Sequence, residues 1–415
     1  MRDDTMMGTA PVLLVGGVDT HADSHTLAVL NSQGRVQFTE TFPADQNGYQ
    51  ALIDRLNHTG HLDVVGVEGT NSYGAGLTRA LQENGFTVKE VLRPTRQVRR
   101  LAGKSDPVDA IQAARSVLAG DGVSDPKDTT TPAESLRFLL VTRESLVSTA
   151  TSVIVTIKSL LITAPEELRS RYRGMSNLKL IRGLAQSRPR PHNLNAPAVA
   201  AIHALRDLAR TYQELTTRAE HLETQITEIL AEHYPAVLDI YCAGPITAAQ
   251  LVVTTGGNPE RVRNEAAFAQ LCGAAPIPAS SGKTTRHRLN RGGDRRGNRA
   301  LYRIAVVRLR HDPRTKEYAQ RRRAEGKTSL EIIRCLKRAI AREAYRALTH
   351  PKATQPGTPH HDLRARRHAH QLSQNDVAKA LGIPPARISD IETRRRPLPA
   401  LTTRYAEWLN TLDTQ

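Results

Sequence analysis

The sequence predicts a mixed α/β domain at the amino end of the chain, followed by mostly helical domains and a small all-helical unit at the carboxyl end. Three observations predict this fold class. Strand and helix patterns alternate through the first part of the chain, apolar residues then recur at heptad spacing, and a short helical pattern follows a linker rich in Pro, Gly and His. A chain of 415 residues is long enough for several such domains.

The first domain is assigned to residues 1–122. An apolar run at 12–19 ends in an acid, and alternating segments follow at 25–30 and 35–42, joined by a turn. Further strands are predicted at 63–68 and 86–92, and helices at 48–56, 73–84 and 107–119. A hairpin followed by alternating strands and helices indicates a mixed sheet with helices packed against it.

The second domain, residues 123–235, is predicted to be helical and to contain a coiled coil. Its apolar side chains alternate spacings of three and four at Leu205, Leu208, Tyr212, Leu215, Ala219, Leu222, Ile226 and Ile229. Such a seam is typical of a helix that packs along a partner helix. That partner is either another subunit or a helix of the same chain, and both interpretations stay open.

The remaining chain divides into a mostly helical domain at 236–350, a linker at 351–361 and a small unit at 362–415. The formal net charge of the chain is +17, and most of the excess lies between residues 281 and 346, with 21 Lys and Arg against 6 Asp and Glu. A basic window of this kind indicates a nucleic-acid partner, whereas a solvated basic surface is the alternative.

The three cysteines lie far apart, at Cys242, Cys272 and Cys335, without a CxxC pair. This pattern excludes a disulfide framework or a zinc site of the usual spacing and suits a reducing compartment. The sequence pattern predicts neither a signal peptide nor a membrane partner. We therefore expect a cytoplasmic, nucleoid-associated protein.

Four acidic residues are candidate metal ligands. Asp19 and Glu68 end two apolar strands, and Asp106 and Asp109 are spaced three apart at the start of a helix, so that they share one face. Grouped carboxylates repel one another unless a cation neutralises them, and hard divalent ions such as Mg²⁺ prefer oxygen ligands. Two such ions can stabilise the attacking and leaving oxygens of a phosphodiester. Alternatively, Asp106 is a helix N-cap with Pro107 as the first helical residue.

The segments Val-Asp-Thr-His at 18–21, Val-Glu-Gly-Thr at 67–70 and Lys-Ser-Asp-Pro-Val-Asp-Ala at 104–110 resemble the DEDD signature of a family of insertion-sequence transposases. The resemblance implies an RNase H-like (RuvC-like) fold for the first domain. It also implies that Asp19, Glu68, Asp106 and Asp109 bind the metal, Mg²⁺ or Mn²⁺.

Segments at 268–276, 280–283, 291–294 and 297–301 are similar to the serine-bearing transposase domain of the same family. The match selects Ser281 as the nucleophile, with Ser280 as the alternative. A serine hydroxyl needs activation by a base or a metal, and neighbouring cations can hold the phosphate that it attacks. The candidate nucleic-acid-binding residues in this region are Lys283, Arg286, Arg288, Arg291, Arg295, Arg296 and Arg299.

The carboxyl-terminal unit resembles a helix-turn-helix of the phage-repressor type. Ser373 is predicted to cap one helix, Gly382 to turn the chain, and the next helix to start near Pro385. Arg387 and Ser389 are expected to face the major groove and Gln374 to contact phosphate. The resembled transposase family usually lacks this unit, so it is a departure from the pattern.

Together these features predict a transposase that cuts and rejoins the DNA of an insertion element. The resemblance implies a bridge RNA that selects donor and target DNA, and a dimer or tetramer in which carboxylates and serine meet across subunits. Two alternatives remain. One is a nuclease of the junction-resolving kind, which needs the carboxylates but not the serine. The other is a non-catalytic regulator that uses only its helix-turn-helix.

Overall fold

The structure, a computed structural model, describes residues 13–92, 105–189, 194–280, 287–351, 363–392 and 398–413. It divides into two compact units, Met1–Asp128 and Thr129–Gln415, and each is described by itself. The first unit therefore extends to Asp128, beyond the boundary at residue 122 that the sequence suggests, because a short strand after that point joins its sheet.

The first unit is built on a six-stranded sheet with the order β3-β2-β1-β4-β5-β6. The strands are β1 (Leu14–Thr20), β2 (Ser24–Asn31), β3 (Val36–Pro43), β4 (Leu62–Glu68), β5 (Thr87–Val91) and β6 (Val123–Ser124). β1, β2 and β3 form an antiparallel meander, β4 and β5 run parallel to β1, and β6 is antiparallel to β5. The predicted mixed sheet and the strands that the sequence assigned to it are confirmed.

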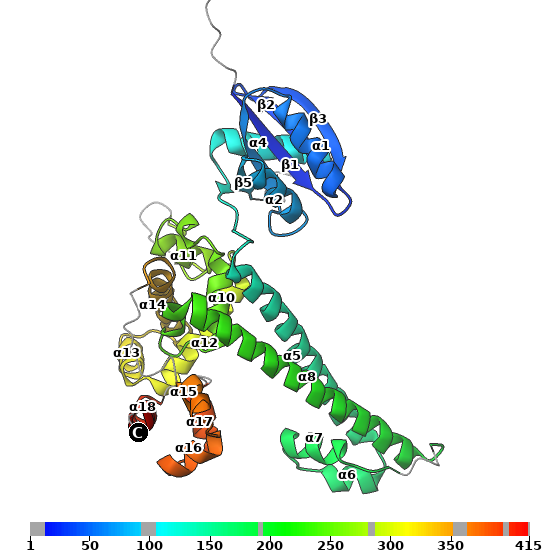
Figure 1. The fold of residues 1–415 in the computed structure, drawn as a ribbon, viewed down its shortest axis with the longest axis vertical. Coiled ribbons are helices and arrows are strands. Elements are labelled where there is room, and N and C mark those ends of the chain that lie inside the picture. Colours follow the sequence, from blue (N-terminus) through cyan, green and yellow to red (C-terminus); the bar gives the residue numbers. More distant parts are fainter. Residues whose placement is uncertain are drawn as a thin grey trace, which may run out of the picture. The chain divides into compact units, whose positions relative to one another are not determined.

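Helices cover both faces of this sheet (Figure 1). On one face α1 (Gln46–Asn57) and α2 (Ala75–Glu83) bury side chains such as Leu52 and Leu77 against Val18 and Val65. On the other face lies α4 (Asp106–Ala119), whose alanines pack with Val15, Ala28 and Leu30. Alternate residues of β1 thus face opposite layers, as the pleat of a strand requires.

Two glycines let α4 approach the sheet closely. A Cβ atom at Gly17 would lie 2.2 Å from the Ala114 nitrogen, and one at Gly66 would lie 2.5 Å from a Val117 methyl carbon. Separations this short do not occur between such atoms. The glycines of β1 and β4 are therefore required for the helix to sit directly on the strands.

In the second unit two long helices, α5 (Pro132–Thr163) and α8 (Pro197–His233), lie side by side (Figure 1). The heptad residues Leu205, Ala219 and Ile226 are buried, whereas Leu215 and Leu222 are half-buried. An ion pair between Arg143 and Glu223 at 2.7 Å joins the two helices. The seam of α8 therefore has a partner within its own chain, and a contact between subunits stays a prediction.

By length and composition, α5 is apolar enough to cross a membrane, and 17% of its most apolar window is buried. Phe138, Val155 and Ile162 are among its exposed apolar side chains. In this structure α5 packs along α8. Its carboxyl end is followed by two short helices, α6 (Glu166–Tyr172) and α7 (Asn177–Ala185), within the range that the sequence predicts to be helical.

The amino end of α5 and the carboxyl end of α8 pack against a helical core. Its elements are α9 (Pro235–Leu238), α10 (Pro245–Thr255), the 3₁₀ turn η1 (Pro259–Arg261), α11 (Glu265–Leu271), α12 (Arg295–His311), α13 (Pro313–Ala324) and α14 (Ser329–Thr349). Phe268, Leu301 and Ile304 lie at the centre of this core with no more than a trace of exposed surface. A two-stranded hairpin of β7 (Ile277–Pro278) and β8 (His287–Arg288) precedes α12.

The chain ends in four short helices with their own apolar core: α15 (Leu363–Ala369), α16 (Gln374–Leu381), α17 (Pro385–Glu392) and α18 (Pro399–Asp413). Ser373 caps α16 in a capping box with Asp376, and Gly382 ends that helix in the left-handed conformation at φ 63°. The predicted cap, turn and start of the next helix at Pro385 are all confirmed.

Candidate functional site

Two acidic side chains lie next to each other at the carboxyl ends of parallel strands. Val18 of β1 is the register partner of Val67 of β4, so Asp19 and Glu68 are neighbours. They are almost fully buried, with 6% and 5% of their surface exposed. The Thr20 hydroxyl donates to the Glu68 carbonyl oxygen at 2.7 Å and ties the two strand ends together. In sheets with parallel strands this edge is where ligands commonly bind.

The helix α4 adds the other two acids to the same place. Asp19 lies two residues beyond Gly17, and therefore on the face of β1 that α4 covers. Ala110 packs over Gly17, and Asp106 lies one helical turn before Ala110. Asp106 and Asp109 occupy the first turn of α4, while Ser105 is the N-cap. The alternative that Asp106 is merely the N-cap is therefore wrong.

A histidine joins this cluster. The His21 Nε2 atom lies 3.2 Å from Asp19 Oδ2 and 3.3 Å from Asp106 Oδ1. One ligand atom from each of these three residues falls within 4.8 Å of the others, close enough to hold a metal ion. Sequence reasoning did not select His21. The available signal was its position two residues after Asp19, inside the DEDD-like segment.

The electrostatics at Asp19 favour a bound cation. Burial raises the pKa of this carboxyl, the nearby His21 lowers it, and the carboxylates of Asp109 and Asp106 raise it again, with a net upward direction. Among the described residues no well-aligned hydrogen bond reaches the buried Asp19 Oδ2, although His21 Nε2 is near. A buried carboxylate without full pairing is costly, and a divalent ion with oxygen ligands removes that cost. The residues present therefore fit a metal such as Mg²⁺ or Mn²⁺.

The candidate nucleophile Ser281, with Lys283 and Arg286, lies outside the described residues. These three positions belong to the segment that connects β7 with β8. Hydrogen bonds hold the chain in place on either side of the hairpin. Asn298 Nδ2 donates to the Cys272 carbonyl at 2.7 Å, and Lys337 Nζ donates to Asn298 Oδ1 at 2.9 Å.

The other predicted basic residues of this unit fall into two groups. Arg288, Arg291 and Arg295 are exposed around the start of α12. Arg296 and Arg299, in the first two turns of α12, are also exposed but form ion pairs with Glu144 of α5. The structure thus brings Arg296 and Arg299 together and adds an acidic partner that the sequence did not indicate.

Comparison with known proteins places these regions. Residues 16–164 match the IS110-type DEDD transposase model, and residues 235–320 match the family described as "Transposase IS116/IS110/IS902 family". Each of these two matches covers less than half of the chain. Residues 361–414 also match a helix-turn-helix domain. The family description agrees with the resemblance that the motifs indicated.

Two curated relatives are similar to part of this chain, at nearly the same sequence identity. One is the "Insertion element IS900 uncharacterized 42 kDa protein" of Mycobacterium paratuberculosis, 31% identical over 134 residues, or 32% of this chain and 34% of the relative. The other is the "Insertion element IS110 uncharacterized 43.6 kDa protein" of Streptomyces coelicolor, 32% identical over 129 residues, or 30% and 32%. The chain thus spans about a third of the length of these relatives.

The predicted DNA-contacting residues of the helix-turn-helix lie among intramolecular partners. Gln374 is half-buried and donates to Glu392 Oε2 at 2.8 Å, and Arg387 lies 3.5 Å from Asp390 Oδ2. Ser389 lies half-buried on α17, two residues after Arg387. The predicted DNA contacts of these three side chains stay predictions.

Proposed function

We propose that this IS110-type chain is a transposase that cuts and rejoins the DNA of an insertion element. The observation that carries the proposal is the meeting of Asp19, His21 and Asp106 beside Glu68, at the carboxyl edge of a mixed sheet. This edge lies inside the region that matches the DEDD transposase model. The matched region covers only about a third of each relative, so the proposed activity rests on the site of this chain.

An RNase H-like, RuvC-like assignment of the first domain is part of this proposal. Its support is the antiparallel meander β1–β3 followed by β4 and β5 parallel to β1. On this arrangement β1 lies at the centre of the sheet, and its last residues meet both β4 and the start of α4. The domain ranges proposed from the sequence are 1–122, 123–235, 236–350, a linker at 351–361, and 362–415. With the first domain extended to residue 128, the second begins at residue 129.

In the proposed mechanism Asp19, Glu68, Asp106 and Asp109 would hold Mg²⁺ or Mn²⁺, with His21 beside them. Bound there, the metal would supply Lewis-acid stabilisation of charge on a phosphodiester. The protein residues have separate tasks. Burial of Asp19 and Glu68 between the sheet and α4 limits the access of water, and His21 orients the Asp19 and Asp106 oxygens toward one point.

The second step of the proposal concerns Ser281, with Ser280 as the alternative. The serine hydroxyl would lose its proton as its oxygen forms a bond to a DNA phosphorus. The bond from that phosphorus to the leaving DNA oxygen would break, and that oxygen would take up a proton. Exposed cations near the hairpin, Arg288, Arg291 and Arg295, are suited to hold the phosphate. A covalent protein–DNA link would conserve the energy of the phosphodiester for rejoining.

The proposed partners are donor and target DNA and a bridge RNA that selects them. The basic window of α12 to α14 and the helix-turn-helix supply surfaces for nucleic acid. A dimer or tetramer would bring carboxylates and serine together across subunits, with the half-buried Leu208, Leu215, Leu222 and Ile229 as candidate contacts. We place the assembly in the cytoplasm, associated with the nucleoid.

The test separates a transposase from a junction-resolving nuclease. Asp19→Asn should abolish DNA cleavage while DNA binding persists, and EDTA should do the same. A stalled reaction of the unaltered protein should contain protein joined covalently to a DNA end, and Ser281→Ala, but not Ser280→Ala, should remove that adduct. Hydrolytic nicks without an adduct, from a fully active Ser281→Ala protein, would favour the nuclease. Full activity in EDTA would remove the carboxylate mechanism, and DNA binding without any cleavage by the unaltered protein would favour the helix-turn-helix regulator.

A further inference from the structure

A row of arginines lines a cavity in the second unit. Arg296, Arg299 and Arg303 are spaced three and four apart on α12, so that their side chains share one face of the helix. They border a cavity of about 370 Å³ that α5 and α10 close from the other sides. Thr247 and Gln250 of α10 supply polar groups to its lining.

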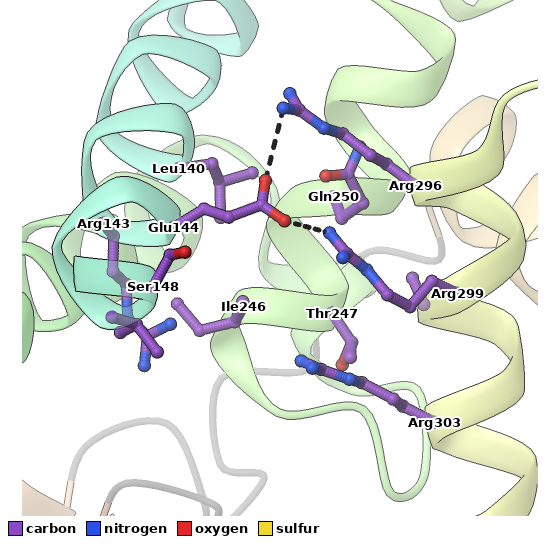
Figure 2. A pocket seen from close by; sticks show the side chains of 12 residues that line it. Leu140, Arg143, Glu144, Ser148, Ile246, Thr247, Gln250, Arg296, Arg299 and Arg303 are labelled. Atoms are coloured by element: carbon purple, nitrogen blue, oxygen red, sulfur yellow. Dashed lines mark hydrogen bonds and ion pairs between the residues drawn. The ribbon is translucent and has the colours of Figure 1, made fainter. Parts of the chain in front are cut away.

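A single carboxylate reaches into this row. Glu144 Oε1 lies 2.5 Å from Arg299 Nη2, and its Oε2 lies 3.2 Å from Arg296 Nη2 (Figure 2). Hydrogen bonding from Arg299 and the charges of Arg296 and Arg303 hold the pKa of Glu144 below its ordinary value, against the effect of burial. Glu144 is therefore ionised at neutral pH.

The charges in the cavity do not balance. Three guanidiniums of α12 face one carboxylate, and Arg303 forms no ion pair among the described residues. A fourth guanidinium, that of Arg143, pairs instead with Glu223 at 2.7 Å, and its buried Nε has no hydrogen-bond partner within the described chain. An unbalanced set of guanidiniums around open space is suited to a further anion.

The chemistry of guanidinium identifies that anion. Its planar set of N–H donors matches the paired oxygens of a carboxylate or a phosphate, and both bind in the same geometry. Glu144 is 42% exposed on its side chain, so it can be displaced at small cost. A backbone phosphodiester has two non-bridging oxygens, as a carboxylate has, on a larger tetrahedral group with two further ester oxygens, and it can engage Arg303 as well.

We propose that this cavity binds a phosphate of a nucleic-acid backbone, and that Glu144 occupies its arginines until the phosphate displaces the carboxylate. Glu144 acts as an internal competitor that lowers affinity for isolated phosphates and favours polymers that also contact the basic surface nearby. The inference deepens the proposed function, since it assumes that the chain binds nucleic acid. The phosphate comes from either DNA or RNA, which present the same group.

The test is a salt titration of binding with the full chain, using a labelled duplex DNA and a labelled single-stranded RNA of matching length. Glu144→Gln should tighten binding about two- to fivefold at low salt, as for removal of a half-exposed competing charge. Arg303→Gln should weaken it and lower the slope of log affinity against log salt by about 0.7–0.9. The polymer whose affinity changes in these two variants is the source of the phosphate.

Two controls separate a local competitor from a general charge effect. Glu134→Gln removes the same charge from α5, at a residue that pairs with Arg137 and does not line the cavity, and it should leave affinity unchanged. In an Arg299→Gln background the gain from Glu144→Gln should shrink, because the carboxylate then competes for fewer cations. Equal effects of Glu144→Gln and Glu134→Gln, in a protein that binds nucleic acid, would overturn this inference alone. Failure of the unaltered chain to bind either polymer would overturn the proposed function with it.

Discussion

At the scale of single residues, the arrangement of His21 matters most for the chemistry. Its imidazole lies between the carboxylates of Asp19 and Asp106, which would otherwise face one another directly. If a metal binds there, His21 is either a ligand or the group that orients the ligands, and outer groups of this kind strongly affect metal affinity. The DEDD pattern alone would not have indicated this role.

We expect His21→Ala to weaken Mn²⁺ binding by the full-length protein about ten- to hundredfold, as for loss of a group that orients metal ligands. Titration followed by calorimetry or by the paramagnetic signal of Mn²⁺ measures the effect directly. His58→Ala, which removes an exposed histidine directly after α1, is the control and should bind as the unaltered protein does. If the His21→Ala protein binds Mn²⁺ as tightly as the unaltered protein does, His21 has no part in the metal site.

At the scale of elements, the helix-turn-helix is held together by a buried polar network. Glu392 at the end of α17 accepts hydrogen bonds from Arg367 at 2.7 Å, Gln374 at 2.8 Å and Tyr405 at 2.9 Å. The side chain of Glu392 has no exposed surface, and that of Arg367 has 6%. One carboxylate thus joins α15, α16, α17 and α18, and the predicted recognition helix depends on it for its position.

This network predicts acid sensitivity of the helix-turn-helix. Burial would raise the pKa of Glu392, but the hydrogen bonds from Arg367, Gln374 and Tyr405 hold it below its ordinary value. An ionised carboxylate whose folded pKa is lowered stabilises the fold above the unfolded pKa of about 4.3. That stability is lost as the pH falls through the lower folded pKa.

Glu392→Gln should destabilise the four-helix unit by about 3–5 kcal/mol, the usual cost of breaking a buried ion pair, and should remove this acid transition. Trp408, the single tryptophan of the chain, lies in α18 and reports on this unit by fluorescence. Glu407→Gln, which changes an exposed residue of α18, should leave the acid transition in place. The same unfolding curve for Glu392→Gln and unaltered protein would contradict the assignment.

At the scale of the whole molecule, the chain combines a carboxylate unit, a serine-bearing unit and a helix-turn-helix that has its own core. Leu363, Val377, Ile388 and Tyr405 belong to that apolar core, and among the described residues it contains none from the preceding helices. The helix-turn-helix follows a Pro- and Gly-containing linker at 351–361. A unit with its own core behind such a linker is expected to be separable.

Deleting residues 362–415 should therefore leave the remaining chain folded, with weaker DNA binding, most clearly at high salt, where fewer phosphate contacts remain. Anisotropy titrations at several salt concentrations measure the affinity, and light scattering measures the assembly. Strand exchange by the shortened protein should be reduced but present. Unchanged affinity at every salt concentration would make the helix-turn-helix dispensable for DNA binding, and loss of folding would show that the units depend on each other.

The sequence by itself determined the features that depend on local patterns. Alternation and buried runs predicted β1 to β5, and Ser373 and Gly382 predicted the ends of α16, because caps and strand pleats are set by neighbouring residues. The DEDD-like segments selected the four acids as candidate ligands, and their role in metal binding stays a prediction. Tertiary packing decided the rest. Glu144 meets Arg299 across 155 positions of sequence, His21 meets Asp106 only because Gly17 admits α4, and α8 finds its partner in α5. Contacts between distant residues follow from how helices and strands pack, and no local pattern encodes them.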